Sequence, residues 1–152
     1  MKPASDNATP SGNGTMAGVL GRLFYLTGKA SYRERAEKVI RVFASEANHN
    51  PVGLATLLNA YEFLNQALQV TILGDPQTEE TRALLRAVHG VSIPNRVLLV
   101  VPDGHALPPG HPAAGKERVD GRATCYLCWG PVCDAPITEA SALEAALRKP
   151  GE

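Results

Sequence analysis

Apolar residues recur at helical spacing through the first half of the chain. The first apolar stripe runs from Met16 to Thr27 and includes Leu20 and Leu23 on the same face. Gly28 follows at once, and glycine adopts the left-handed conformation that ends many helices at little cost. This pattern predicts one amphipathic helix that starts near residue 15 and ends at Gly28.

Two further stripes predict two more helices. Ser31 and Glu34 have the spacing of a capping box, and an apolar face follows over residues 32–47. Asn50-Pro51 then offers a capping side chain followed by proline in the first turn, ahead of the leucine-rich stripe at residues 54–68. Because the connections are short, we expect the three helices to be antiparallel neighbours.

The period changes in the second half. Residues 69–73 are β-branched and apolar, and Thr78 opens a short helical pattern that reaches Val88. Residues 96–101 form a continuous apolar run, of the kind buried on both faces of a sheet. The order of strand, helix and strand predicts a right-handed βαβ unit with parallel strands.

The remaining residues complete an α+β fold. A Pro/Gly-rich loop follows residue 101, then a short strand is expected at residues 124–128 and a closing helix at 139–147. We therefore divide the chain into a loop at residues 1–14, a helical segment at 15–67 and a small α/β segment at 68–152. The predicted architecture is three antiparallel helices followed by a βαβ-β unit and a C-terminal helix.

Composition excludes several classes of function. The chain has 152 residues, with 15 Lys and Arg against 15 Asp and Glu, and only 5% of its residues are aromatic. A chain with no net charge and few aromatic residues has no net electrostatic field to attract nucleic acid and few side chains on which bases could stack. No run approaches the ~20 apolar residues that span a bilayer, and the first residues do not resemble a signal peptide. Three cysteines, an odd number, favour a reducing compartment, so we expect a cytoplasmic protein.

The cysteines are the sharpest local feature. Cys125 and Cys128 form a Cys-x-x-Cys pair, and Cys133 follows after four residues. A zinc site would need a fourth ligand, and only His105 or His111 in the preceding loop is near in sequence. A thioredoxin-like site would need the pair at a helix N-terminus, whereas this pair lies in a predicted strand. We favour partly buried thiols, with Cys128 and Cys133 as the thiol candidates, and predict no metal and no cofactor.

The Ser11-Gly12-Asn13-Gly14 segment is the second local feature. Small and polar residues before a helix leave backbone N–H groups free to meet a ligand, so Ser11 and Asn13 are candidates for a substrate pocket. Capping of the helix by either side chain is the simpler interpretation. No catalytic residue is identified, because the acids Glu62, Asp103 and Asp120 fall on unrelated elements.

The ordered set of segments resembles the YyaL-like, spermatogenesis-associated family of thioredoxin-domain-containing proteins. The segments that carry the resemblance are Thr9-Pro10-Ser11-Gly12-Asn13-Gly14, Tyr25-Leu26-Thr27-Gly28, Tyr32-Arg33-Glu34-Arg35-Ala36-Glu37, Val70-Thr71-Ile72-Leu73-Gly74-Asp75-Pro76, Pro94-Asn95-Arg96-Val97-Leu98-Leu99, and residues 120–128 with Cys133 and Pro136-Ile137-Thr138. In the family the two cysteines that correspond to Cys128 and Cys133 recur, and Cys125 is an addition.

The resemblance implies a larger parent architecture. Family members begin with a thioredoxin-like domain, followed by an (α/α)6 barrel akin to six-hairpin glycosidases and sugar 2-epimerases. This chain would hold the last barrel helices and the C-terminal α/β segment. It would then be a fragment or subunit without a catalytic site of its own, acting by self-association or by docking on the missing parts. The alternatives are part of a sugar epimerase or isomerase, and a small thiol or zinc module.

Overall fold

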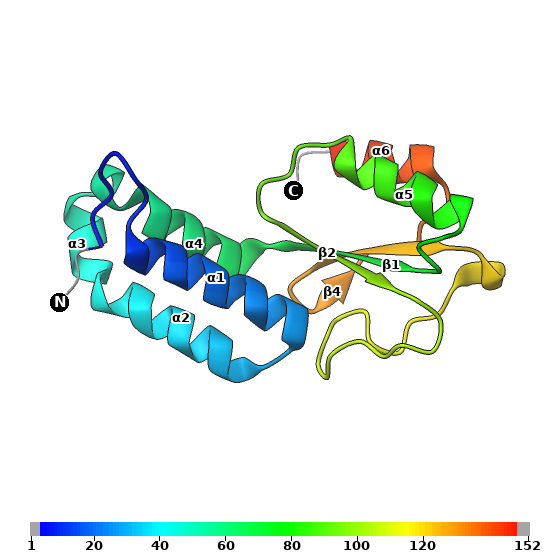
Figure 1. The fold of residues 1–152 in the computed structure, drawn as a ribbon, viewed down its shortest axis with the longest axis horizontal. Coiled ribbons are helices and arrows are strands. Elements are labelled where there is room, and N and C mark those ends of the chain that lie inside the picture. The colour runs from blue at the N-terminus through cyan, green and yellow to red at the C-terminus, as the bar shows by residue number, and fades with distance from the viewer. Residues whose placement is uncertain (1–3, 149–152) are drawn as a thin grey trace. The chain divides into compact units, whose positions relative to one another are not determined.

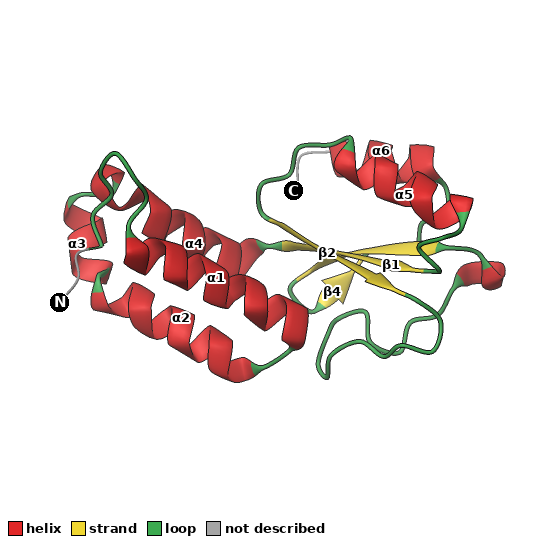
Figure 2. Ribbon diagram, viewed as in Figure 1, coloured by secondary structure: helices red, strands yellow, loops and turns green. Residues whose placement is uncertain are grey.

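The computed structural model describes residues 4–148, which form a helical unit up to Ala67 and an α/β unit from Leu68 (Figures 1 and 2). The ends of the expected loop at 1–14 and of the expected α/β segment at 68–152 lie outside the described residues. Helices and a four-stranded sheet together make the fold α+β, as the hydrophobic pattern predicts.

The helical unit consists of α1 (Gly12–Thr27), α2 (Ala30–Val42), the short α3 (Ala44–His49), a 3-10 turn (Val52–Leu54) and α4 (Ala55–Gln66). Gly28 ends α1 as predicted: it has a φ of 68°, and its N–H donates to the carbonyl of Phe24. Asn50 accepts a hydrogen bond from the N–H of Gly53 at 3.1 Å. This bond ties Asn50 to the 3-10 turn that leads into α4, and the α-helix itself begins later than expected.

The second predicted helix is broken. We expected one helix over residues 32–47, but Phe43 has φ −108° and ψ 8°, so α2 ends there and α3 starts in a new direction. The apolar spacing continues across the break, which explains why periodicity alone predicts a single helix. The capping-box prediction is also wrong, because α2 begins at Ala30 and Ser31 lies inside it.

Helix α1 packs against both α2 and α4. Small side chains such as Ala17, Ala36 and Ala60 are almost fully buried at these contacts, where they allow the helices to approach closely. Leu57 and Leu64 of α4 fill the space between them. The helical unit thus has its own apolar core.

The α/β unit consists of β1 (Leu68–Leu73), α5 (Glu79–His89), β2 (Arg96–Val101), β3 (Thr124–Trp129), β4 (Val132–Cys133) and α6 (Ala140–Arg148). The sheet order is β2-β1-β3-β4. Strands β1 and β2 are parallel, which confirms the predicted pairing, and β3 runs antiparallel to β1. Strand β4 was not predicted; it forms a tight hairpin with β3.

The order of the strands corrects one expectation about burial. We expected residues 96–101 to be buried on both faces, but β2 is the outer strand and most of its side chains are partly exposed. The central position belongs to β1, in which all six residues are buried. The two strands have similar apolar composition, so only the strand order of the sheet shows which of them is buried and which lies at the edge.

The two faces of the sheet are covered differently. Helices α5 and α6 lie together on one face, where Leu84, Val88 and Leu143 pack on the apolar side chains of β1 and β3 (Figure 1). The loop at residues 102–118 covers the other face, and its Ala113 packs with Leu73. Within residues 4–148, no helix has both the length and the apolar character needed to span a membrane.

Candidate functional site

The Ser11–Gly14 segment joins the N-terminal ends of α1 and α4. The Ser11 hydroxyl accepts a hydrogen bond from the N–H of Gly14 at 3.2 Å and so caps α1. Asp6 accepts from the N–H of Ser11 at 2.8 Å with one oxygen and from the N–H of Thr56, in the first turn of α4, at 2.7 Å with the other. These backbone hydrogen bonds, with that of Thr56 first, hold the pKa of Asp6 below its usual value.

Gly14 allows the two helix ends to meet. A Cβ at this position would lie 2.8 Å from the backbone nitrogen of Leu57 and 2.9 Å from the Ser11 hydroxyl oxygen. Ser11 is buried and its hydroxyl acts as a cap, which is the simpler of the two roles considered for it. Sequence reasoning missed Asp6, whose contact with Thr56 spans fifty positions and leaves no local pattern.

Asn13 faces a different feature, a groove between α1 and α2. The groove has a volume of about 530 Å³ and its lining residues are Asn13, Met16, Leu20, Arg35, Lys38, Val39, Val42 and Phe43. Leu20 and Phe43 are buried and form its floor, whereas Met16 and Val42 are each 54% exposed at its margin. We call this feature the α1–α2 groove.

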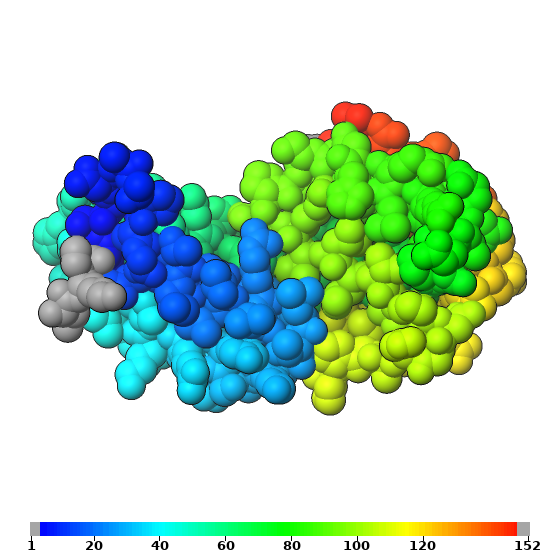
Figure 3. Space-filling model, in the orientation of Figure 1, coloured from blue at the N-terminus to red at the C-terminus, as the bar shows by residue number. Residues whose placement is uncertain are grey.

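The apolar surface of α1 extends beyond the groove. Val19 is 47% exposed and Leu26 is 42% exposed, although both lie on a helix whose opposite side is packed. Helices α1 and α2 form much of the face of the helical unit that is seen in blue and cyan in Figure 3. Arg35 and Lys38 supply positive charge beside this apolar surface.

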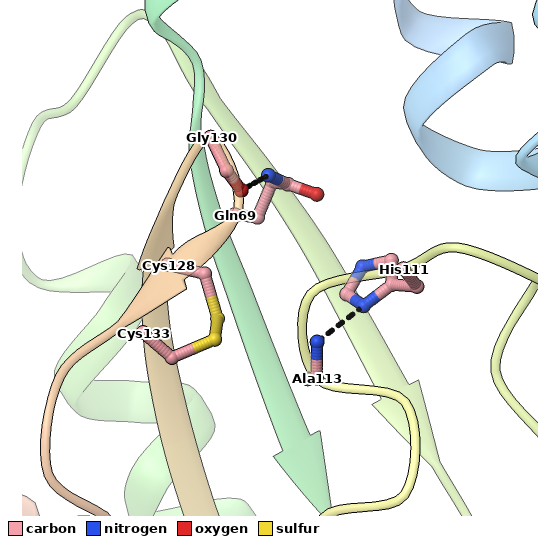
Figure 4. Close-up of a disulfide and its surroundings, with 6 residues drawn as sticks. All are labelled: Gln69, His111, Ala113, Cys128, Gly130 and Cys133. Carbon is pink, nitrogen blue, oxygen red and sulfur yellow. Dashed lines mark hydrogen bonds between the residues drawn. A yellow bond between two sulfur atoms is a disulfide. The ribbon is translucent and has the colours of Figure 1, made fainter.

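Cys128 and Cys133 form a disulfide (Figure 4). The bond joins the two thiol candidates, although the odd number of cysteines did not favour a disulfide. The reason is the hairpin of β3 and β4, which places the two residues directly opposite each other across antiparallel strands. The odd number of cysteines no longer supports a reducing compartment, because one pair is oxidised and only Cys125 is a free thiol.

The cysteines do not gather into a metal site. Cys125 is buried on the helix-covered face of the sheet, where it packs with Leu127, while Cys128 lies on the loop-covered face. Burial raises the pKa of Cys125 to about 12, so this thiol stays protonated. Among residues 4–148, no group of three or more His, Cys, Asp or Glu side chains is arranged to hold a metal ion.

His111 belongs to the loop at residues 102–118, on the same face of the sheet as the disulfide. It is 8% exposed, and its Nδ1 accepts a hydrogen bond from the N–H of Ala113 at 3.1 Å (Figure 4). Its Nε2 has no hydrogen-bond partner among the described residues. Burial lowers the pKa of the His111 imidazole, which is therefore neutral at the usual pH of a cell.

The acidic residues considered at first do not converge. Glu62 lies on α4 of the helical unit, whereas Asp103 lies in the loop of the α/β unit and Asp120 in the 3-10 turn Val119–Gly121 that follows it. Asp103 pairs with Arg118 at 3.0 Å, and Asp120 has a φ of 50° within a 3-10 turn. The structure has an apolar groove and a disulfide, and these three acids do not form an acid–base pair.

Long relatives match this chain along almost its whole length. Spermatogenesis-associated protein 20 of Rattus norvegicus is 32% identical over 98% of the chain, and that of Homo sapiens is 31% identical over 97%. An uncharacterised protein of Caenorhabditis elegans is 27% identical over 95%. The chain is thus similar to spermatogenesis-associated protein 20, which agrees with the resemblance seen in its sequence.

The relatives are much longer than the chain. The match spans 19% of the rat and human proteins and 20% of the nematode protein, so the chain covers about a fifth of each. No protein-family model matches the chain. No solved structure matches it either.

Proposed function

We propose that this chain acts by association, as the C-terminal part or a subunit of a larger protein similar to spermatogenesis-associated protein 20. In this proposal the helical unit supplies the last hairpins of a six-hairpin, glycosidase-like (α/α)6 barrel. The chain has no self-contained catalytic site and contributes a surface that docks on the rest of the barrel. The exposed apolar surface along α1 and the α1–α2 groove is the observation that carries this proposal.

The amount of exposed apolar surface supports docking. Single exposed apolar side chains are normal on a monomer, but contiguous apolar patches on soluble proteins often mark interaction sites. Here Met16 and Val42 flank one groove, and Val19, one helical turn from Met16 in the sequence of α1, is also exposed. Covering a half-exposed side chain of this size stabilises a complex by about 1 kcal/mol. The exposed apolar residues here would together contribute a few kcal/mol toward offsetting the entropy that is lost on association.

The shape of the surface fits a helix as the occupant. Two adjacent helices leave a groove between them, and the ridge of side chains on a third helix packs into such a groove. A sugar pocket, as in an epimerase, would need several polar groups around the substrate hydroxyls. The α1–α2 groove instead has an apolar floor of Leu20 and Phe43, with Asn13 as its one uncharged polar side chain. This composition favours a protein partner over a sugar.

The test measures association of the full chain and of groove variants. Sedimentation velocity over a range of concentrations, with and without the unmatched remainder of a long relative, detects self-association and docking. We expect Val42→Asp to weaken association by about tenfold or more, because a carboxylate must lose its hydration in an apolar contact. Val52→Asp is the matched control, since Val52 is 86% exposed and does not line the groove.

Two outcomes contradict the proposal. A compact monomer that resists dilution and does not bind the unmatched remainder would show that the surface is not a docking site. Equal weakening by Val42→Asp and Val52→Asp would show that the loss comes from added charge rather than from the groove. Circular dichroism of each variant establishes that its helices are intact.

A further inference from the structure

The Cys128–Cys133 disulfide lies at the edge of the sheet. Strand β4 contains only two residues and pairs with β3 alone, so the bond joins the last two strands of the sheet. The turn between them is held from one side, where the Gln69 side chain donates to the carbonyl of Gly130 at 3.2 Å (Figure 4). The hairpin thus has hydrogen bonds besides the sulfur–sulfur bond, including one from the N–H of Asp134 to the carbonyl of Leu127 at 2.8 Å.

The two sulfur-bearing residues have unequal surroundings. Cys128 is fully buried among Leu73, Ala113 and Tyr126 on the loop-covered face. Cys133 is partly exposed, and the residues that precede it in the turn are open to solvent. The approach to the disulfide is therefore more open on the side of Cys133 than on the side of Cys128.

The tip of the hairpin is also an exposed apolar surface. Trp129 is 45% exposed and Val132 is 67% exposed, on either side of the turn that leads to Cys133. Tryptophan is among the residues that contribute most to the binding free energy of protein–protein interfaces. A protein that presents a thiol to Cys133 would find an apolar contact next to it.

From these three observations we propose that Cys128–Cys133 is a redox-active disulfide that exchanges with the dithiol of a partner protein. The partner thiolate attacks the sulfur of Cys133, and the bond between Cys133 and Cys128 breaks. Cys128 leaves as a thiolate and takes up a proton. The second partner thiol then attacks the mixed disulfide, which releases Cys133. The products are two reduced cysteines in this chain and one disulfide in the partner.

The third cysteine takes no part in this exchange. Cys125 is buried on the opposite face of the sheet, in the core beneath α5 and α6. Burial also raises its pKa to about 12, so little thiolate is present to compete. The exchange is confined to one pair, which makes Cys125 an internal control.

The first experiment treats the folded wild-type chain with dithiothreitol, blocks free thiols with an alkylating reagent and locates the labels by mass spectrometry. We expect a label on Cys133 without denaturant, whereas the buried Cys128 and Cys125 are labelled only after denaturation. A Cys133 that is labelled only after denaturation would overturn the proposal. This measurement needs no variant and does not depend on whether the chain associates through the α1–α2 groove.

The second experiment tests the direction of attack. Cys128→Ser leaves Cys133 as the only accessible thiol, and Cys133→Ser leaves Cys128 in its buried position. With an aromatic disulfide as the probe, we expect Cys128→Ser to react at least about tenfold faster, because access limits the rate. Equal rates, or faster reaction of Cys133→Ser, would overturn the assignment of Cys133 as the attacked sulfur. If either variant is unfolded, native labelling of the wild type decides.

Discussion

Asp6 offers a direct test of how the helical unit is held together. Its two carboxylate oxygens accept hydrogen bonds from the N–H of Ser11 at 2.8 Å and of Thr56 at 2.7 Å, so Asp6→Ala leaves two helix ends without an acceptor. A hydrogen bond to a charged group stabilises a fold by about 1.5–3 kcal/mol. Because Asp6 is partly exposed, we take the lower end for each of the two bonds and expect a total loss of about 3 kcal/mol.

The loss should depend on pH in a defined direction. The pKa of Asp6 is lowered in the folded state, so its contribution is fully present above the pKa of an unfolded aspartate, about 3.9. The contribution disappears as the pH falls through the lower, folded value. The difference in stability between wild type and Asp6→Ala should therefore be largest near neutral pH and shrink in acid.

Urea unfolding followed by circular dichroism measures this difference. Trp129, the chain's single tryptophan, reports the α/β unit by fluorescence, so a change confined to the dichroism signal is assigned to the helical unit. Asn7→Ala is the control, because the Asn7 side chain makes only a local bond to the N–H of Ala8. A loss below about 0.5 kcal/mol, or the same loss at every pH, would refute the bridging role.

Two predictions concern the α/β unit. Gly74→Ala should lower the free energy of unfolding of this unit by about 1–3 kcal/mol in urea, because a Cβ there would lie 2.5 Å from the Thr81 hydroxyl oxygen. Gly12→Ala is the control: it has open space around it and should be neutral or slightly stabilising. Burial lowers the pKa of His111, so its neutral form contributes stability above about pH 6.5 that is lost as the pH falls through the folded value. Urea unfolding followed by Trp129 fluorescence, at about pH 7 and about pH 5, measures this loss in the free energy of unfolding. We expect it in the wild type and not in His111→Asn.

Elements with strong local signals could be predicted from the sequence. Gly28 ends α1 and the Thr78 side chain caps α5, because each acts on backbone groups only a few positions away. The parallel pairing of β1 with β2 followed from the helix between them. These features depend on local geometry, which amino-acid type encodes well.

Features that depend on distant contacts could not be predicted. The break at Phe43 interrupts no apolar spacing, so only the packed helical unit reveals it. The two-residue strand β4 is too short for an alternating pattern, and without it the disulfide partners could not be assigned. Of the pocket candidates, Ser11 is a buried cap and Asn13 lines a groove whose other wall comes from α2.

The strand order has a consequence for how the chain folds while it is being synthesised. Every residue of the helical unit has been made by Ala67, so that unit can form its own core before the sheet is synthesised. The central strand β1 follows at once, but its partner β3 is paired from Leu73 with Thr124 to Leu68 with Trp129. A growing chain thus carries its most buried strand with one side unpaired until more than fifty further residues have been added. Non-local pairing of this kind is slow to form and leaves apolar strand exposed in the meantime.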